Sequence, residues 1–186
     1  MNDLATPIAY PWTGTFAGLE VTFRHMTAQD RDQILAFTRA LPERDLLFLR
    51  LDITQESVVD AWIHNIETGK TFSILAEADG RLLGYCSLHL SESLWTRHLG
   101  EIRMLVAREA RGKGIGGELA RQIFELARDR DLMKLMVRMM SSQQDAQTLF
   151  HRLGFIPEAM LGDWVIDRNG RTHDLILMSR EIEEAL

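Results

Sequence analysis

A short apolar run, a glycine-rich basic turn and a helical pattern follow one another in this chain and constrain its fold more than any other segment. The apolar run spans residues 102–107, which is long enough for one buried strand. The basic turn spans residues 108–117, and apolar residues then recur at helical spacing over residues 119–127. Glycine lets backbone N–H groups approach an anion, and a helix N-terminus carries partial positive charge. The segment therefore predicts a phosphate-binding site at the turn.

Two known phosphate-binding motifs fit this turn incompletely. The P-loop of nucleotide hydrolases needs a Ser or Thr after its Lys to bind magnesium, but Lys113 is followed by Gly114. The dinucleotide fingerprint G-x-G-x-x-G does match Gly112, Gly114 and Gly117. That motif also requires an acidic residue at the end of the next strand, and residues 134–140 contain no carboxylate. Dinucleotide binding is therefore the weaker alternative.

A third motif fits better, because the turn resembles the cofactor loop of the GNAT superfamily of acyl-CoA-dependent N-acyltransferases. Residues 111–116 read RGKGIG and match the pattern Arg/Gln-x-x-Gly-x-Gly/Ala. Arg24 followed by Asp30 resembles the opening strand and helix start of the family. Residues 146–155 resemble its A-x-x-L-Y-x-x-x-G-F segment. The resemblance covers the chain from residue 21 to the C-terminus.

The resemblance implies acetyl-CoA as co-substrate and a set of coenzyme A contacts. Backbone amides of the loop hold the pyrophosphate, and the pantetheine arm pairs with the backbone of the preceding strand, as an added strand does. A further contact is implied where the family often has an Asn. The implied cofactor-binding residues are Leu105, Val106, Arg111, Gly112, Lys113, Gly114, Ile115, Gly116 and Gln143.

Glu101 is the candidate general base. An amine that attacks a thioester has to lose a proton, and in part of the family a Glu at the matching Glu-Ile position accepts it. For this role its side chain would need a partly desolvated site, which raises the pKa of the carboxyl group. Glu92 is a second candidate base in the neighbouring segment.

The family's usual acid, a Tyr that protonates the departing thiolate, is replaced in this chain by Phe150, which cannot donate a proton. His151 is adjacent, but neighbouring residues of a helix point about 100° apart. Cys86 lies within an expected strand and is interpreted as a core residue rather than a nucleophile. The sequence therefore indicates that the thiolate leaves without a Tyr donor.

The predicted fold is α/β of the α+β type, similar to the GNAT fold. It has a mixed, mostly antiparallel central sheet of about seven strands, four main helices and one parallel central crossover. The parallel pair comprises residues 100–107 and 132–140, because a helix connects them. Asp79-Gly80 and Asn169-Gly170 predict hairpins, the second with a type I′ turn. Residues 1–20 are expected to form an irregular N-terminal arm, and residues 21–186 the N-acetyltransferase domain.

Composition excludes several function classes. A net charge of −6 argues against nucleic acid as a general partner. No apolar run reaches the ~18 residues of a membrane span, and the first 18 residues lack the order of a signal peptide. A single cysteine suits a cytoplasmic location, and the six histidines show no metal-ligand spacing apart from the weak pair His89 and His98.

We therefore predict an N-acetyltransferase that moves an acetyl group from acetyl-CoA to a primary amine of a small molecule or a lysine, with a homodimer as a further possibility. The resemblance implies that the segment between the first two long helices shapes the acceptor site, which makes Arg44, Asp45 and Arg50 candidate acceptor contacts. A non-catalytic acyl-CoA-binding module, suggested by Phe150, is the main alternative, and a dinucleotide-binding protein the lesser one.

Overall fold

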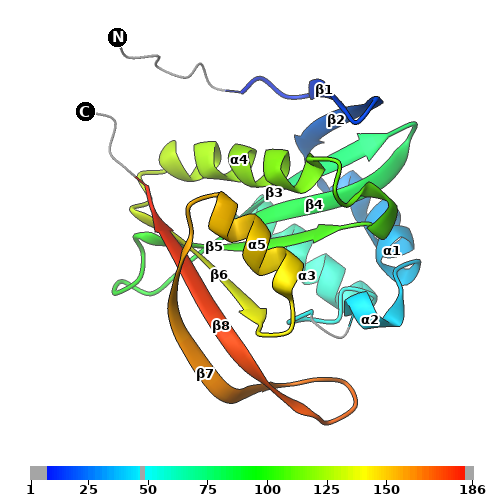
Figure 1. Cartoon of the computed structure of the whole chain (residues 1–186). Helices are drawn as coiled ribbons and strands as arrows, with labels where there is room; N and C mark the ends of the chain where they lie inside the picture. Colours follow the sequence, from blue (N-terminus) through cyan, green and yellow to red (C-terminus); the bar gives the residue numbers. More distant parts are fainter. Residues whose placement is uncertain (1–7, 47–48, 183–186) are drawn as a thin grey trace.

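The computed structural model describes residues 8–46 and 49–182, which form one eight-stranded sheet with helices on both faces (Figure 1). The strands are β1 (Trp12–Phe16), β2 (Leu19–His25), β3 (Thr71–Ala78), β4 (Arg81–Leu90), β5 (Leu99–Val106), β6 (Lys134–Met140), β7 (Ile156–Ile166) and β8 (Thr172–Glu181). The helices are α1 (Arg31–Arg39), α2 (Glu43–Leu46), α3 (Glu56–Glu67), α4 (Ile115–Arg128) and α5 (Gln144–Arg152). The strands lie in the order β1-β2-β3-β4-β5-β6-β8-β7.

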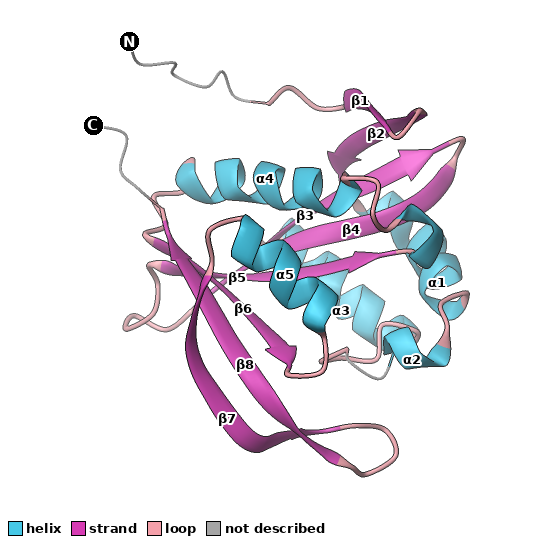
Figure 2. Ribbon diagram, viewed as in Figure 1, coloured by secondary structure: helices cyan, strands magenta, loops and turns pink. Residues whose placement is uncertain are grey.

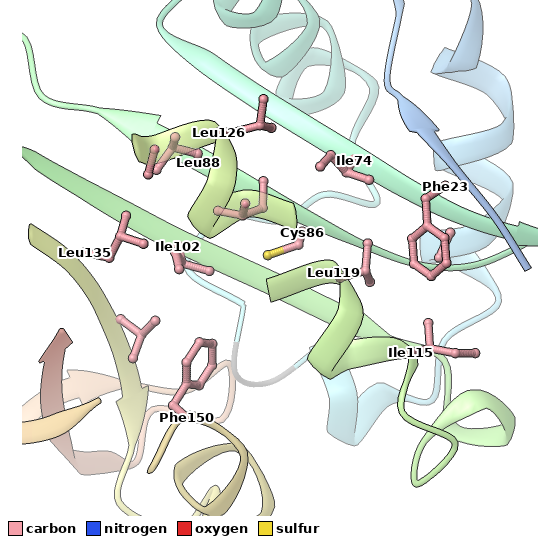
Figure 3. Packing of buried hydrophobic residues seen from close by; sticks show 14 of the residues in the cluster. Phe23, Ile74, Cys86, Leu88, Ile102, Ile115, Leu119, Leu126, Leu135 and Phe150 are labelled. Atoms are coloured by element: carbon pink, nitrogen blue, oxygen red, sulfur yellow. The ribbon is translucent and has the colours of Figure 1, made fainter. Parts of the chain in front are cut away.

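Two apolar cores lie on opposite faces of this sheet. α4 and α5 cover one face, and α1 and α3 lie on the other (Figure 2). On the α4 face, Leu119 packs in one cluster with Cys86 and Ile102 (Figure 3). On the α3 face, Tyr85 and Leu105 belong to a second cluster. Because side chains alternate along a strand, this parity assigns the residues of β5, and those of β4 from Tyr85 onwards, to one face or the other.

The parallel pair β5 and β6 separates along its length, which opens the centre of the sheet (Figure 1). Their pairing runs only from Leu99 opposite Lys134 to Ile102 opposite Val137. β5 then continues to Val106 and β6 to Met140 without pairing to each other. The edge of β5 that faces β6 therefore has unpaired backbone groups over its second half.

Most of the predicted elements are confirmed. All neighbouring strands are antiparallel except β5 and β6, and α4 connects that pair. Asp79 and Gly80 have φ values of 49° and 71° between β3 and β4, which is the backbone that a tight hairpin requires. Arg24 binds the Asp30 carboxylate at 2.7 Å, so the predicted opening strand is joined to the start of α1.

The irregular arm predicted for the N-terminal residues is wrong from Trp12 onwards. Residues 12–16 form β1, which pairs with β2 through a two-residue turn, Ala17-Gly18, with φ values of 50° and 81°. Trp12 and Phe16 each place a ring 5.4 Å from the ring of Phe23. The alternation of these aromatic residues leaves one side of β1 half-buried against β2. β1 is an additional strand, so the sheet has eight strands rather than about seven. The domain boundary at residue 20 stays a prediction.

The C-terminal hairpin is confirmed, but its turn differs from the predicted type. Its first strand, β7, runs from Ile156 to Ile166. The connection is closed by hydrogen bonds from the Asp167 N–H to the Arg171 carbonyl and from the Gly170 N–H to the Asp167 carbonyl. Only Gly170 of this turn has positive φ, 78°, whereas a type I′ turn requires two such residues.

Across the described residues, no helix is long and apolar enough to cross a membrane.

Candidate functional site

A groove of about 1020 Å³ lies on the α3 face, where β5 and β6 separate. Its floor is formed by side chains of β4, β5 and β6, and α3 forms one wall. The tip of the β7–β8 hairpin contributes Trp164 and Ile166, and α5 contributes Phe150 through the gap between the strands. The groove therefore adjoins both the sheet centre and the segment before α3, where we expected the acceptor.

Glu101 lies buried on the floor of this groove, with three arginines around its carboxylate. Its side chain is 9% exposed. Arg50 contacts both carboxylate oxygens, at 2.7 and 2.6 Å. Arg103 donates to Oε2 at 3.0 Å, and Arg138 donates to Oε1 through Nε at 2.8 Å and lies 2.7 Å away through Nη2. We call Glu101, Arg50, Arg103 and Arg138 the arginine cluster.

Strand parity explains why these residues meet. Glu101 and Arg103 are two residues apart on β5 and so project from the same face. Glu101 is opposite Met136 in the parallel register of β6, which places Arg138, two residues further, on that face as well. Arg50 reaches the cluster from the connection between α2 and α3. Glu101 and Arg50 were predicted from the sequence, but Arg103 and Arg138 were not. The alternation of β5 and the parallel register of β6 could have revealed them.

The charges around Glu101 reverse the effect that we predicted for its burial. Burial alone raises the pKa of this carboxyl group, but the positive charges and hydrogen bonds of Arg103, Arg50 and Arg138 outweigh it. The pKa therefore lies below its ordinary value, so the raised pKa that the base role needs is absent from this arrangement of the arginines. The carboxylate is ionised at neutral pH and has arginine donors on both oxygens.

His89 is the cross-strand neighbour of Glu101 and the second ionisable group of the floor. Its Nδ1 is 3.1 Å from the Thr71 hydroxyl. Burial, followed by the charge of Arg103, lowers its pKa to about 4, so the ring is neutral at neutral pH. Next to it, the Ser87 and Ser73 hydroxyl groups are 2.7 Å apart, and they form a buried polar strip beneath α3.

The glycine-rich loop presents free backbone donors at the start of α4. Gly112 and Gly114 have φ values of 74° and 90°, which L side chains rarely adopt. As far as the described residues go, no backbone N–H of residues 112–117 donates to a protein acceptor. Six adjacent donors at the N-terminus of a 14-residue helix suit a phosphate or diphosphate group. The loop therefore fits the anion-binding role that the sequence predicted, although its contacts with coenzyme A stay a prediction.

The side chains of the loop differ in what they are free to contact. Arg111 donates to the Val106 carbonyl at 2.9 Å and to the Asp45 carboxylate at 2.8 Å. Lys113 is exposed. A Cβ atom built on Gly116 meets neighbouring side chains of β5 and α5 at 3.5–3.6 Å, which is ordinary contact. Arg111 thus supports the loop and joins it to α2, whereas Lys113 is available to an anion.

The gap between β5 and β6 is lined by backbone groups of Met104 and Val106. The Ala107 N–H bonds the Leu83 carbonyl, so antiparallel alternation points the backbone groups of Leu105 towards β4. Those of Met104 and Val106 point towards the gap instead. Of the two residues predicted to contact pantetheine, Val106 therefore faces the gap, although its carbonyl already accepts from Arg111, and Leu105 faces β4. Met104, which was not predicted, also faces the gap, and contact of any of these residues with pantetheine stays a prediction. Gln143 lines the groove, and its side-chain oxygen accepts from the Met140 N–H at 2.9 Å.

The residues at the expected acid position offer no proton donor. Phe150 is buried and packs edge-on against Phe155 at 5.1 Å. His151 is exposed and does not line the groove. Cys86 is fully buried on the opposite face of the sheet, and burial raises its pKa, so it cannot serve as a nucleophile there.

The remaining acceptor and metal candidates are placed as follows. Asp45 lines the groove but pairs with Arg111, and Glu92 pairs with Lys70 at 2.6 Å. The side chain of Arg44 lies outside the described residues. Among residues 8–46 and 49–182, no group of three His, Cys, Asp or Glu side chains is arranged to hold a metal ion.

Comparison with known proteins gives consistent matches. Residues 35–155 match the sequence model of the Acetyltransferase (GNAT) family. A Bacillus subtilis (strain 168) protein with the provisional name ribosomal protein bS18-alanine N-acetyltransferase is 27% identical over 128 residues, which cover 67% of this chain and 79% of that protein. The crystal structure of a ribosomal-protein-alanine N-acetyltransferase from Brucella melitensis has a TM-score of 0.75 at 25% identity, covering 86% of this chain and 98% of that one. A GNAT superfamily phosphinothricin acetyltransferase from Sinorhizobium meliloti, solved in complex with AcCoA, has the same fold, with a TM-score of 0.77 at 21% identity over 88% of this chain and 89% of that one.

Proposed function

Because the chain belongs to the acetyltransferase (GNAT) family, we propose that it transfers the acetyl group of acetyl-CoA to the primary amine of an acceptor bound in the groove. The observation that carries this proposal is the separation of β5 from β6 beyond Ile102 and Val137. It leaves an unpaired strand edge between the free amides of the loop and the arginine cluster.

This arrangement suits a thioester of coenzyme A. The pyrophosphate is assigned to the free amides of residues 112–117, with Lys113 adding a full positive charge. The amide-bearing pantetheine arm can then pair with the gap-facing backbone groups of Met104 and Val106, as an added strand would. An arm in this position directs the acetyl group towards the groove floor.

The chemistry that follows is a direct transfer. The ammonium first gives one proton to the base, and the free amine nitrogen then forms a bond to the thioester carbonyl carbon. The C–S bond breaks, and the nitrogen loses its second proton to water. A backbone N–H on the free edge of β5 can stabilise the oxyanion that develops on the carbonyl. Phe150 supplies no proton, so the thiolate leaves as the anion and takes its proton from water.

Glu101 is the proposed proton acceptor. It is ionised at neutral pH, as a base must be, and it is the buried carboxylate of the groove floor. Its lowered pKa makes it a weak base while the three arginines contact it. The base role therefore requires that the acceptor displace at least one guanidinium group from the carboxylate.

Release of free thiol from acetyl-CoA, measured over a panel of amines, tests the proposal. We expect thiol release to depend on the amine and to match the amount of acetylated amine found by mass spectrometry. Tight acetyl-CoA binding with no thiol release on any amine would instead support the non-catalytic module suggested by Phe150. Thermal stabilisation by NAD or NADP but not by acetyl-CoA would favour the dinucleotide alternative.

A further inference from the structure

The arginine cluster carries more positive than negative charge, although the whole chain has a net charge of −6. Three guanidinium groups face one carboxylate, so two positive charges are left uncompensated there. The other carboxylates that line the described part of the groove, Asp45 and Glu92, already pair with basic side chains. The floor of the groove is therefore an anion site that Glu101 only partly satisfies.

A hydrogen-bond donor in the cluster points to the same conclusion. The Nε atom of Arg103 is buried and has no acceptor among the described residues. Buried donors of native proteins are nearly always paired with an acceptor. The Arg103 guanidinium binds Glu101 through Nη2 and leaves its Nε unsatisfied, so the side chain has a donor to gain an acceptor for if it reorients towards a ligand in the groove, to which it is 29% exposed.

We propose that the acceptor is a small amine that also carries a carboxylate, as an amino acid does, and that Arg50 and Arg103 bind this carboxylate. The inference rests on the proposed function and names its acceptor class. A planar guanidinium binds a carboxylate through two parallel hydrogen bonds, which gives orientation as well as attraction. Arg50 is well placed for this, because its side chain is 52% exposed and lies at the rim of the groove.

An acceptor of this kind also resolves the difficulty of Glu101 as a base. The incoming carboxylate takes guanidinium donors that now contact Glu101, while the positive ammonium group of the same molecule takes their place beside the Glu101 carboxylate. Each charge of the acceptor then has a partner of opposite sign. The ammonium group then lies against the carboxylate that is proposed to take its proton, so the acceptor that fits the site is also positioned for the proton transfer.

The volume of the groove favours a small acceptor. Pockets for small molecules enclose about 300–1,000 Å³, and this groove of about 1020 Å³ also has to admit the acetyl end of the co-substrate. Trp164 and Ile166 at the hairpin tip add apolar surface to its wall. A lysine side chain of a protein would bring an amine without a carboxylate nearby and would leave the arginines uncompensated.

A matched substrate panel tests the acceptor class. Leucine and glutamate are compared with leucinamide, ethylamine and a lysine-containing peptide, at fixed acetyl-CoA. The amine of leucinamide is less basic than that of leucine, so chemistry alone favours the amide. We expect the carboxylate-bearing acceptors to have higher kcat/KM by about 10-fold or more, the size of a charge-assisted hydrogen bond. Equal or faster acetylation of the amide, ethylamine or the peptide would overturn the inference.

Two variants connect any preference to the arginines. Arg103→Gln and Arg50→Gln should each raise the KM of the carboxylate acceptor by about 10- to 100-fold and leave the KM of acetyl-CoA unchanged. The control is Arg128→Gln, which removes the same charge at the far end of α4. Arg50 lies in a connection between helices, so its variant should fold normally even if Arg103→Gln does not. Unchanged acceptor KM in a folded Arg50→Gln variant refutes its carboxylate contact.

The two proposals fail in different ways. No thiol release with any amine overturns the acetyltransferase mechanism itself. Thiol release that is fast with neutral amines and insensitive to both arginine variants leaves the mechanism standing and overturns the anionic acceptor.

Discussion

Replacing Glu101 by Gln keeps the shape of the side chain and removes the one negative charge of the arginine cluster. Removing one partner from a buried ion pair typically costs about 3–5 kcal/mol of folding stability. The Glu101 side chain is 9% exposed, whereas those of Arg50, Arg103 and Arg138 are 29–52% exposed. Water screens the remaining guanidinium groups, so we expect a loss near the lower limit, about 3 kcal/mol.

The pH dependence of this loss identifies its cause. A carboxylate with a lowered folded-state pKa stabilises the protein above the pKa of an unfolded glutamate, about 4.3, and this stabilisation disappears as the pH falls through the folded value. Urea unfolding of wild type and Glu101→Gln should therefore differ by a constant amount above about pH 5.5. The two curves should converge below about pH 4. A difference that persists unchanged into acid would contradict the electrostatic account.

The same variant tests the base. With saturating acetyl-CoA, the rate should fall by about 100-fold or more, and the loss should shrink as pH rises because more acceptor arrives unprotonated. Glu92→Gln is the control, since it removes an exposed carboxylate at the edge of the same groove and should keep its rate. A Glu101→Gln enzyme that loses stability but keeps its rate and pH profile would show that Glu101 only positions the arginines. His89 would then be the next candidate base.

Three further predictions concern the loop and the thiol. Gly116→Ala should leave the melting temperature unchanged, because the added Cβ makes ordinary contacts. Calorimetry should show coenzyme A binding weakened by about 10-fold or more, because the Cβ keeps the phosphate from the backbone amides. The control, Gly162→Ala in β7, should keep wild-type affinity. Arg111→Ala should cost about 1–2 kcal/mol of coenzyme A affinity, and Asp45→Asn, which frees Arg111, should not weaken binding. Cys86 should resist alkylation in the native protein and react only on unfolding, because its thiol is fully buried and has a raised pKa. Alkylation of the native protein at the rate of an exposed thiol would contradict its placement in the core.

Local patterns were sufficient for most of the fold. The apolar spacing of α4, the Asp79-Gly80 turn and the helix between β5 and β6 each determine a local conformation, and the topology follows from joining them. β1 was missed because Gly14 and two nearby prolines suggested an irregular segment. Its stability comes from Trp12 and Phe16 packing on Phe23, which is a contact between strands that composition cannot reveal.

The site was harder to predict because its charges act together. Glu101 could be selected from its position at the start of β5, but the sign of its pKa shift depends on Arg103 and Arg138. Those two arginines are ordinary strand residues until the register of β4, β5 and β6 is known. Likewise, the gap-facing role of Met104 rather than Leu105 depends on which backbone groups β4 already uses. Sequence patterns identified the elements, but neighbouring strands determine how their groups are used.

The main chain and the side chains of β5 are proposed to contact different substrates, which has a consequence for how such an enzyme can change during evolution. In the proposed mechanism, main-chain groups along its edge pair with the co-substrate, and every amino acid except proline presents the same main chain. The side chains of Glu101 and Arg103, on its groove face, are proposed to contact the acceptor. Substitutions at those two positions and at Arg138 can therefore retarget the acceptor while the donor half of the reaction is inherited intact. Acceptor preference can therefore change among relatives that share the fold, and a few substitutions on the groove face would be enough to alter it by design.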